Sequence, residues 1–85
     1  MVILDVRGEH EWEHDHFDGA IHIYVGHLER NLNNVPSDKP IVVVCGVGER
    51  ASLGASILQR EGFQHVSNLL GGITAWKNAN YPVIK

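Results

Sequence analysis

Apolar residues occur in short runs along this chain, separated by stretches rich in glycine, proline and polar residues. Val2–Val6 and Ile41–Val44 consist mostly of branched apolar residues bounded by polar ones, a pattern typical of strands buried on both faces of a sheet. Shorter runs at Ala20–Ile23 and His65–Leu69 predict two more strands. Four strands are therefore expected.

The clearest helical pattern lies between the third and fourth of these strands. Within Glu49–Glu61, small or apolar residues recur with the spacing of one helix face, at Ala51, Gly54, Ala55 and Leu58. Gly54 costs about 1 kcal/mol relative to alanine, which makes sense if the helix lies close on a sheet. Gly62 stands where a left-handed C-cap belongs, and Phe63 is placed to fold back on the helix. Shorter helices are predicted at Glu9–Trp12, Gly26–Leu32 and Gly72–Ala79.

Strands that alternate with helices predict an α/β fold, here a small parallel sheet of about four strands flanked by helices. A chain of 85 residues has room for one core, so residues 1–85 are interpreted as a single domain.

Composition narrows the classes of function. The formal net charge of −3 leaves no basic surface for nucleic acid, and no apolar run approaches the ~18 residues of a membrane span. One cysteine cannot form an internal disulfide, which argues against a small disulfide-stapled secreted domain. The first residues, MVILDVR, do not resemble a signal peptide, although a chain that had lost one would look the same. We expect no nucleic-acid or membrane partner, and a cytoplasmic protein.

The single cysteine, Cys45, stands where the third strand ends and the long helix is about to begin. In an open parallel sheet, ligands bind outside the carboxyl ends of the strands, and the first N–H groups of a helix favour negative charge. Gly46 and Gly48 leave the backbone free to turn its N–H groups toward one point. This position favours a thiolate, the nucleophilic form of cysteine. The competing interpretation is a small buried core residue, the commoner role of a free cysteine.

The spacing favours the nucleophile, because four residues separate Cys45 from Arg50 and give C-x-x-G-x-R between a strand and a helix. With this loop the chain resembles the rhodanese-like sulfurtransferases. CGVGER is similar to their active-site loop, Leu4–Arg7 to their L-D-V-R, and His16–Ile23 to H-I-P-G-A-I-N-I. GGITAW and YPV, near the end of the chain, are similar to the family's closing segment. The resemblance covers nearly the whole chain.

The resemblance implies a persulfide mechanism that needs no metal and no organic cofactor. Cys45 would be the catalytic residue, taking sulfur from a small donor, thiosulfate or a persulfide, and passing it to a thiol or a protein acceptor. The loop would bind the negatively charged outer sulfur through its N–H groups, with Gly46, Val47, Gly48, Glu49 and Arg50 as the substrate-binding residues. Phosphatases and arsenate reductases on a similar scaffold have five residues between Cys and Arg. Four leave a tighter cradle, which favours a single sulfur over a tetrahedral anion.

Two departures from the family pattern bear on function. Gly46 and Val47 supply no cation and Glu49 offsets Arg50, so a persulfide donor is favoured and thiosulfate turnover is expected to be slow. The family's usual first strand and helix are absent before L-D-V-R. In family members the absent strand lies beside the last strand, so Val66–Leu69 is expected at the edge of the sheet. The strands, numbered in chain order, are expected in the spatial order fourth, third, first, second. An edge strand has unpaired N–H and C=O groups, so we expect another molecule to associate there. The alternative function is a catalytically idle rhodanese-like binding or regulatory module of a longer protein.

Three other features have competing interpretations. Arg50 either binds the substrate anion or bridges to an acid that holds the loop. Asp5 and Arg7 either line the site or, as we favour, are structural, with Asp5 accepting loop N–H bonds and Arg7 paired with a carboxylate such as Glu11. Five histidines fall between residues 10 and 27. No cysteine accompanies them, so we interpret this segment as a solvated polar loop and not as a metal site.

Overall fold

The structure, a computed structural model, describes residues 1–46, 48–69, 71–79 and 82–83. Its elements in chain order are β1 (Val2–Asp5), α1 (Glu9–His14), β2 (Ile21–His22), the 3₁₀ turns η1 (Val25–Arg30) and η2 (Leu32–Asn34), β3 (Ile41–Val44), α2 (Glu49–Arg60), β4 (Val66–Asn68) and α3 (Gly72–Asn78).

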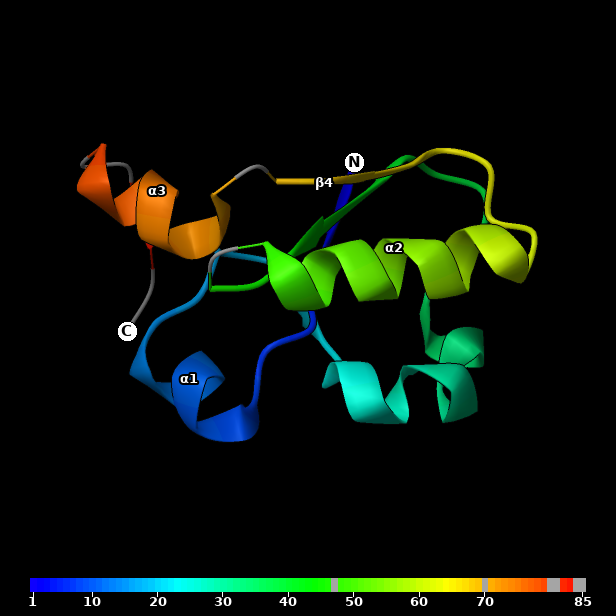
Figure 1. The fold of residues 1–85 in the computed structure, drawn as a ribbon, viewed down its shortest axis with the longest axis horizontal. Coiled ribbons are helices and arrows are strands. Elements are labelled where there is room, and N and C mark those ends of the chain that lie inside the picture. Colours follow the sequence, from blue (N-terminus) through cyan, green and yellow to red (C-terminus); the bar gives the residue numbers. More distant parts are fainter. Residues whose placement is uncertain (47, 70, 80–81, 84–85) are drawn as a thin grey trace.

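The four strands form one parallel sheet in the order β2-β1-β3-β4 (Figure 1). The predicted α/β fold and the predicted strand order are confirmed. β4 lies at one edge of this sheet, as expected. Association of another molecule with this edge stays a prediction. None of the helices in the described ranges is long and apolar enough to cross a membrane.

Side chains that alternate along the central strands build a core on each face of the sheet. One face is covered by α2 and η1, and its buried residues include Leu4, Val6, Leu28, Val43, Cys45 and Leu58. The opposite face is covered by α3, and its buried residues are Phe17, Val44 and Ile73. The Cys45 side chain therefore packs on the sheet face that α2 covers, and the Val44 side chain packs on the opposite face.

The long helix α2 lies close on the sheet, as its glycine predicted. A Cβ on Gly54 would come within 3.2 Å of Val43 Cγ1, tighter than side chains ordinarily pack. The helix ends in the predicted left-handed cap, in which Gly62 has φ +95° and the Phe63 N–H donates to the Leu58 carbonyl at 3.0 Å.

Several predicted elements differ from those observed, and two of these differences have a clear physical reason. The helix expected at Gly26–Leu32 is instead a pair of 3₁₀ turns, because N–H groups such as that of His27 donate to the carbonyl three residues back. Asn31, with φ −124°, separates the two turns. The second strand is shorter than the predicted Ala20–Ile23, since the Ala20 N–H is used in a turn with Phe17.

Candidate active site

Cys45 follows β3 directly and lies within the turn that leads to α2. The residue is only 1% exposed, and its Sγ accepts a hydrogen bond from the Gly48 N–H at 2.9 Å. The backbone reaches this geometry with φ +111° at Gly48, a conformation that favours glycine. An N–H group aimed at the sulfur stabilises negative charge there. The turn thus places a backbone N–H donor directly at the sulfur of Cys45.

The first turn of α3 holds the outer side of the Cys45 loop. The Ile73 N–H donates to the Cys45 carbonyl at 2.8 Å, and the Thr74 N–H donates to the Gly46 carbonyl at 3.0 Å. Gly72 makes this approach possible, because a Cβ on it would lie 2.3 Å from the Cys45 carbonyl oxygen. The sequence indicates a tight turn into the last helix at this point, and the structure adds that this turn anchors the loop.

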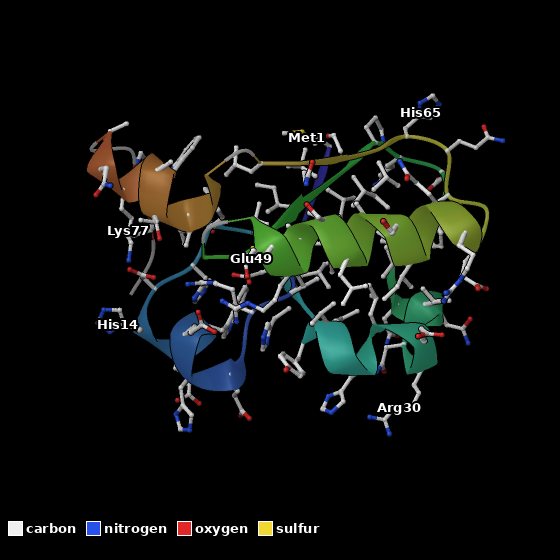
Figure 2. All side chains as sticks on the ribbon, viewed as in Figure 1. Met1, His14, Arg30, Glu49, His65 and Lys77 are labelled. Carbon is white, nitrogen blue, oxygen red and sulfur yellow. The ribbon has the colours of Figure 1, made fainter. Side chains whose placement is uncertain are left out.

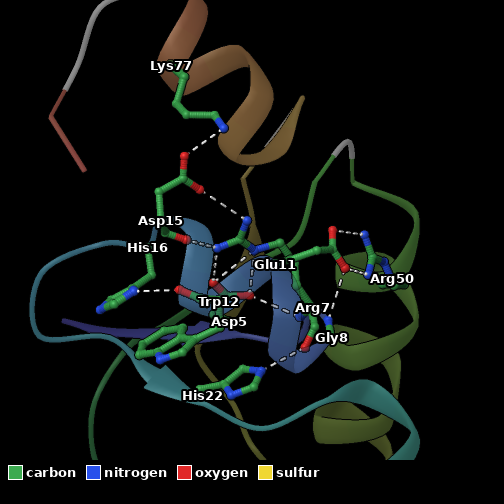
Figure 3. A network of polar contacts seen from close by, with 10 residues as sticks. All are labelled: Asp5, Arg7, Gly8, Glu11, Trp12, Asp15, His16, His22, Arg50 and Lys77. Carbon is green, nitrogen blue, oxygen red and sulfur yellow. Dashed lines mark hydrogen bonds and ion pairs between the residues drawn. The ribbon is translucent and has the colours of Figure 1, made fainter. Parts of the chain in front are cut away.

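Arg50, in the first turn of α2, is held by Glu11 of α1 (Figure 3). Both guanidinium Nη atoms donate to the carboxylate, Nη2 to Oε2 at 2.9 Å, and the Gly8 N–H donates to the same carboxylate at 3.1 Å. The hydrogen bond from Arg50 lowers the pKa of Glu11 to about 2, against the opposing effect of burial. The same bond raises the pKa of Arg50, and Cys45 and Tyr24 contribute to a smaller extent. The predicted bridge from Arg50 to an acid is thus confirmed, and binding of the substrate anion by Arg50 stays a prediction.

Arg7 is buried behind the loop and bonds to Asp5 and Asp15 (Figure 3). Its backbone N–H and its Nε donate to the Asp5 carboxylate at 3.0 and 3.1 Å, and its Nη2 donates to the Asp15 carbonyl at 2.6 Å. The Asp15 carboxylate in turn accepts from Lys77 of α3 at 2.8 Å. The pairing of Arg7 with a carboxylate is confirmed, but Glu11 as its partner was wrong. Arg7 turns inward at the end of β1, whereas Glu11 faces the loop.

We expect Glu11→Gln to remove an acid-sensitive contribution to stability. The pKa of Glu11 is about 2 in the folded protein against an ordinary 4.5, so its stabilisation is complete above pH 4.5 and is lost as the pH falls toward 2. The Glu11 side chain is 41% exposed, which limits the contribution to about 0.5–1 kcal/mol.

Urea unfolding of the parent and of Glu11→Gln at a series of pH values measures this contribution. The difference in free energy of unfolding should be constant from about pH 7 to 5 and should shrink as the pH is lowered further. Asp15, whose lowered pKa also makes stability acid-sensitive, is present in both proteins and cancels from the difference. A difference that does not change with pH would contradict the prediction.

The histidine-rich segment contains a stack of three rings (Figure 3). The indole of Trp12 lies between the imidazoles of His16 and His22, at centroid separations of 3.7 and 4.9 Å. Each imidazole also bonds to a backbone carbonyl at 2.8 Å, that of Trp12 for His16 and that of Arg7 for His22. Among the described residues, no three His, Cys, Asp or Glu side chains come together to hold a metal ion.

One family of known proteins matches almost the whole chain. The sequence model of the family described as Rhodanese-like domain covers residues 1–79. This chain belongs to the rhodanese-like domain family. The resemblance inferred from the loop and the three flanking motifs is thereby confirmed.

Relatives of this rhodanese-like domain include proteins named for sulfur chemistry. The thiosulfate sulfurtransferase GlpE of Coxiella burnetii is 33% identical over 82 residues, which are 96% of this chain and 76% of that protein. The "Putative sulfur carrier protein YrkF" of Bacillus subtilis is 34% identical over 76 residues, and the chain spans 41% of its length. A rhodanese-related protein from Thermoplasma volcanium has the same fold, with a TM-score of 0.92 at 28% identity over 98% of this chain and 82% of that chain.

The structure brings most of the predicted site residues of this rhodanese-like domain together. Cys45, Gly46, Gly48 and Arg50 lie in or beside one turn, and Glu49 is exposed at the first position of α2 (Figure 2). Val47 lies outside the described residues. Sequence reasoning missed the roles of Gly72 and Glu11. Two sequence features could have indicated these roles. One is the pair of glycines Gly71 and Gly72 at the start of the last helix, and the other is Glu11, an acid four residues after L-D-V-R.

Proposed function

We propose that this rhodanese-like domain is a sulfurtransferase that carries a sulfane sulfur as a persulfide on Cys45 and passes it to a thiol or another nucleophilic acceptor. The observation that carries the proposal is the hydrogen bond from the Gly48 N–H to Cys45 Sγ, at the carboxyl end of a central strand. Relatives named thiosulfate sulfurtransferase support it.

Sulfur transfer on Cys45 consists of two displacements. In the first, the Cys45 thiolate attacks the sulfane sulfur of the donor, the donor's own sulfur–sulfur bond breaks, and a thiolate, or sulfite from thiosulfate, leaves with the electron pair. In the second, the acceptor thiolate attacks the outer sulfur of the Cys45 persulfide, the bond to Cys45 breaks, and Cys45 returns as a thiolate. Neither step requires a cofactor.

The loop favours the negatively charged form of sulfur in both steps. The Gly48 N–H points at the sulfur, and α2, a helix of 12 residues, begins at the next residue with the positive end of its dipole. The carbonyls of Cys45 and Gly46 are bonded to α3 instead, which keeps their negative ends from the sulfur.

We expect Glu49→Gln to raise the turnover of thiosulfate. Arg50 is neutralised by Glu11, and Glu49 makes no ion pair within the described part of the chain, so the loop presents negative charge to a dianionic donor. Removing that charge should raise kcat/KM for thiosulfate by about two- to fourfold at low ionic strength. The gain should be smaller for a persulfide donor with one negative charge, and it should fade in high salt. Equal thiosulfate rates for parent and variant would contradict the charge argument.

The alternative is a catalytically idle rhodanese-like module of a longer protein. The burial of Cys45 favours this alternative, because a thiol that is 1% exposed meets a donor only when the loop opens.

Mass spectrometry separates the two functions. The reduced protein is incubated with a low-molecular-weight persulfide, and the intact mass is measured before and after addition of a small thiol. The proposed function predicts a gain of one sulfur atom that maps to Cys45 and that the thiol removes. A Cys45 that stays unmodified would favour the idle module.

A further inference from the structure

A groove of about 800 Å³ lies between α1 and the 3₁₀ turns η1 and η2. In Figure 1 these elements lie next to each other beneath α2. The groove is lined by Glu9, Trp12 and Glu13 of α1 on one side, and by Tyr24 and His27 on the other. The mechanism described above uses none of these side chains.

The groove opens near the carboxyl ends of the strands, the end of the sheet at which the Cys45 loop also lies. The backbone that follows β2 is bonded to β1, through the Ile23 N–H to the Asp5 carbonyl at 3.0 Å and the Val25 N–H to the Val6 carbonyl at 3.1 Å. The Val6 N–H in turn donates to the Val44 carbonyl at 3.0 Å, one residue before Cys45. Neighbouring strands lie about 4.8 Å apart, so the floor of the groove, two strands from β3, lies roughly 10 Å from the loop.

The groove combines aromatic walls with an acidic rim. Glu9 and Glu13 are four residues apart on α1, which places them on one helix face. Both are exposed, and neither forms an ion pair within the described ranges. No lysine or arginine is among the described residues that line the groove. Tyr24 is 41% exposed and meets His27 edge to face at 5.6 Å.

Carboxylates beside an exposed aromatic ring, here that of Tyr24, form a surface that suits lysine and arginine side chains. Such side chains form ion pairs with the carboxylates and a cation–π contact with the ring. We propose that this groove docks a basic segment of the protein that accepts sulfur from Cys45, with lysine or arginine side chains between Glu9, Glu13 and Tyr24. The inference rests on the proposed function. About three extended residues span the roughly 10 Å between the groove and the Cys45 loop. In the acceptor protein, the accepting cysteine therefore lies about three residues from the basic side chains.

Peptide binding tests the docking without turnover. Two peptides of equal length are titrated into the protein. One has two lysines, the other has two glutamines at the same positions, and both have serine in place of the accepting cysteine. The expected result is a Kd about tenfold lower for the lysine peptide at low salt, with the largest amide shifts at Gly8 and Tyr24, which line the groove.

A double variant, Glu9→Gln with Glu13→Gln, should reduce the tenfold preference to about twofold or less. The matched control, Asp18→Asn with Asp38→Asn, removes the same charge at exposed residues that do not line the groove, and it should keep the preference. Equal affinity of the parent for the two peptides, or an equal loss in both double variants, would overturn the docking.

Transfer to the cysteine forms of the same peptides completes the test. The lysine form should take sulfur from the Cys45 persulfide with a kcat/KM about tenfold above the glutamine form, and an equal rate would overturn the role of the groove in acceptor binding. If mass spectrometry finds no added sulfur on Cys45, the proposed function is overturned. The peptide titration does not depend on that result, so it tests the docking separately.

Discussion

Cys45→Ser is expected to abolish sulfur transfer and to leave the fold intact. Serine cannot form the persulfide, so the loss should be complete within the limit of detection. The side chain is nearly the same size, and the Gly48 N–H that donates to Sγ can donate to the serine hydroxyl instead. The exchange of a buried thiol for a hydroxyl should therefore lower Tm by only about 5 °C.

Circular dichroism and transfer from a persulfide to a small thiol measure the two halves of this prediction. Cys45→Ala is the companion variant, since it removes the sulfur without adding a polar group to the core cluster that contains Cys45. Transfer by either folded variant would rule out a covalent intermediate on this residue. Unfolding of both variants would show that Cys45 serves mainly as a core residue.

Gly72→Ala is expected to destabilise the protein by about 3 kcal/mol or more, which corresponds to a Tm lower by roughly 10–20 °C. The added Cβ would lie 2.3 Å from the Cys45 carbonyl oxygen and 2.5 Å from that of Gly46. The first turn of α3 must then move away from the loop, and the bonds from the Ile73 and Thr74 N–H groups are lost. Sulfur transfer by the fraction that stays folded should fall as well, because the loop loses its anchor.

Gly62→Ala is the matched control for this substitution. Gly62 also has a positive φ, +95° against +61° for Gly72, but nothing lies within 4 Å of a Cβ added there. The control therefore carries the backbone cost without the collision, about 1–2 kcal/mol. Thermal unfolding of the two variants isolates the contribution of close packing between α3 and the loop. Equal losses of stability would show that this packing contributes nothing.

The pattern of apolar residues predicted the sheet and the long helix well. Ile41–Val44 is a strand with the predicted bounds, and α2 ends within one residue of its predicted end, because Gly62 caps it. The pattern was less informative for η1. Leu28 and Leu32, four residues apart, suit one face of an α-helix, but the segment follows the spacing of 3₁₀ turns. A short segment with few apolar residues is shaped by its neighbours more than by its own sequence.

The candidate site was predictable where its members are neighbours in the chain. The loop from Cys45 to Arg50 could be read as one motif. The pairing of the two arginines could not be predicted, because five acids, Asp5, Glu9, Glu11, Glu13 and Asp15, lie near Arg7 in the sequence and any of them was a possible partner. Glu11 pairs instead with Arg50, 39 residues away.

The sequence by itself determined the parallel α/β sheet, the place of Cys45 between a strand and a helix, and membership of the rhodanese-like domain family. These depend on local periodicity and on short motifs, which a chain displays before it folds. Only the tertiary structure decided that Glu11 holds Arg50, that α3 anchors the loop through Gly72, and that a groove with an acidic rim opens beside it. Ion pairs and close backbone contacts depend on angstrom-scale distances between segments far apart in the chain, and local patterns do not encode those distances.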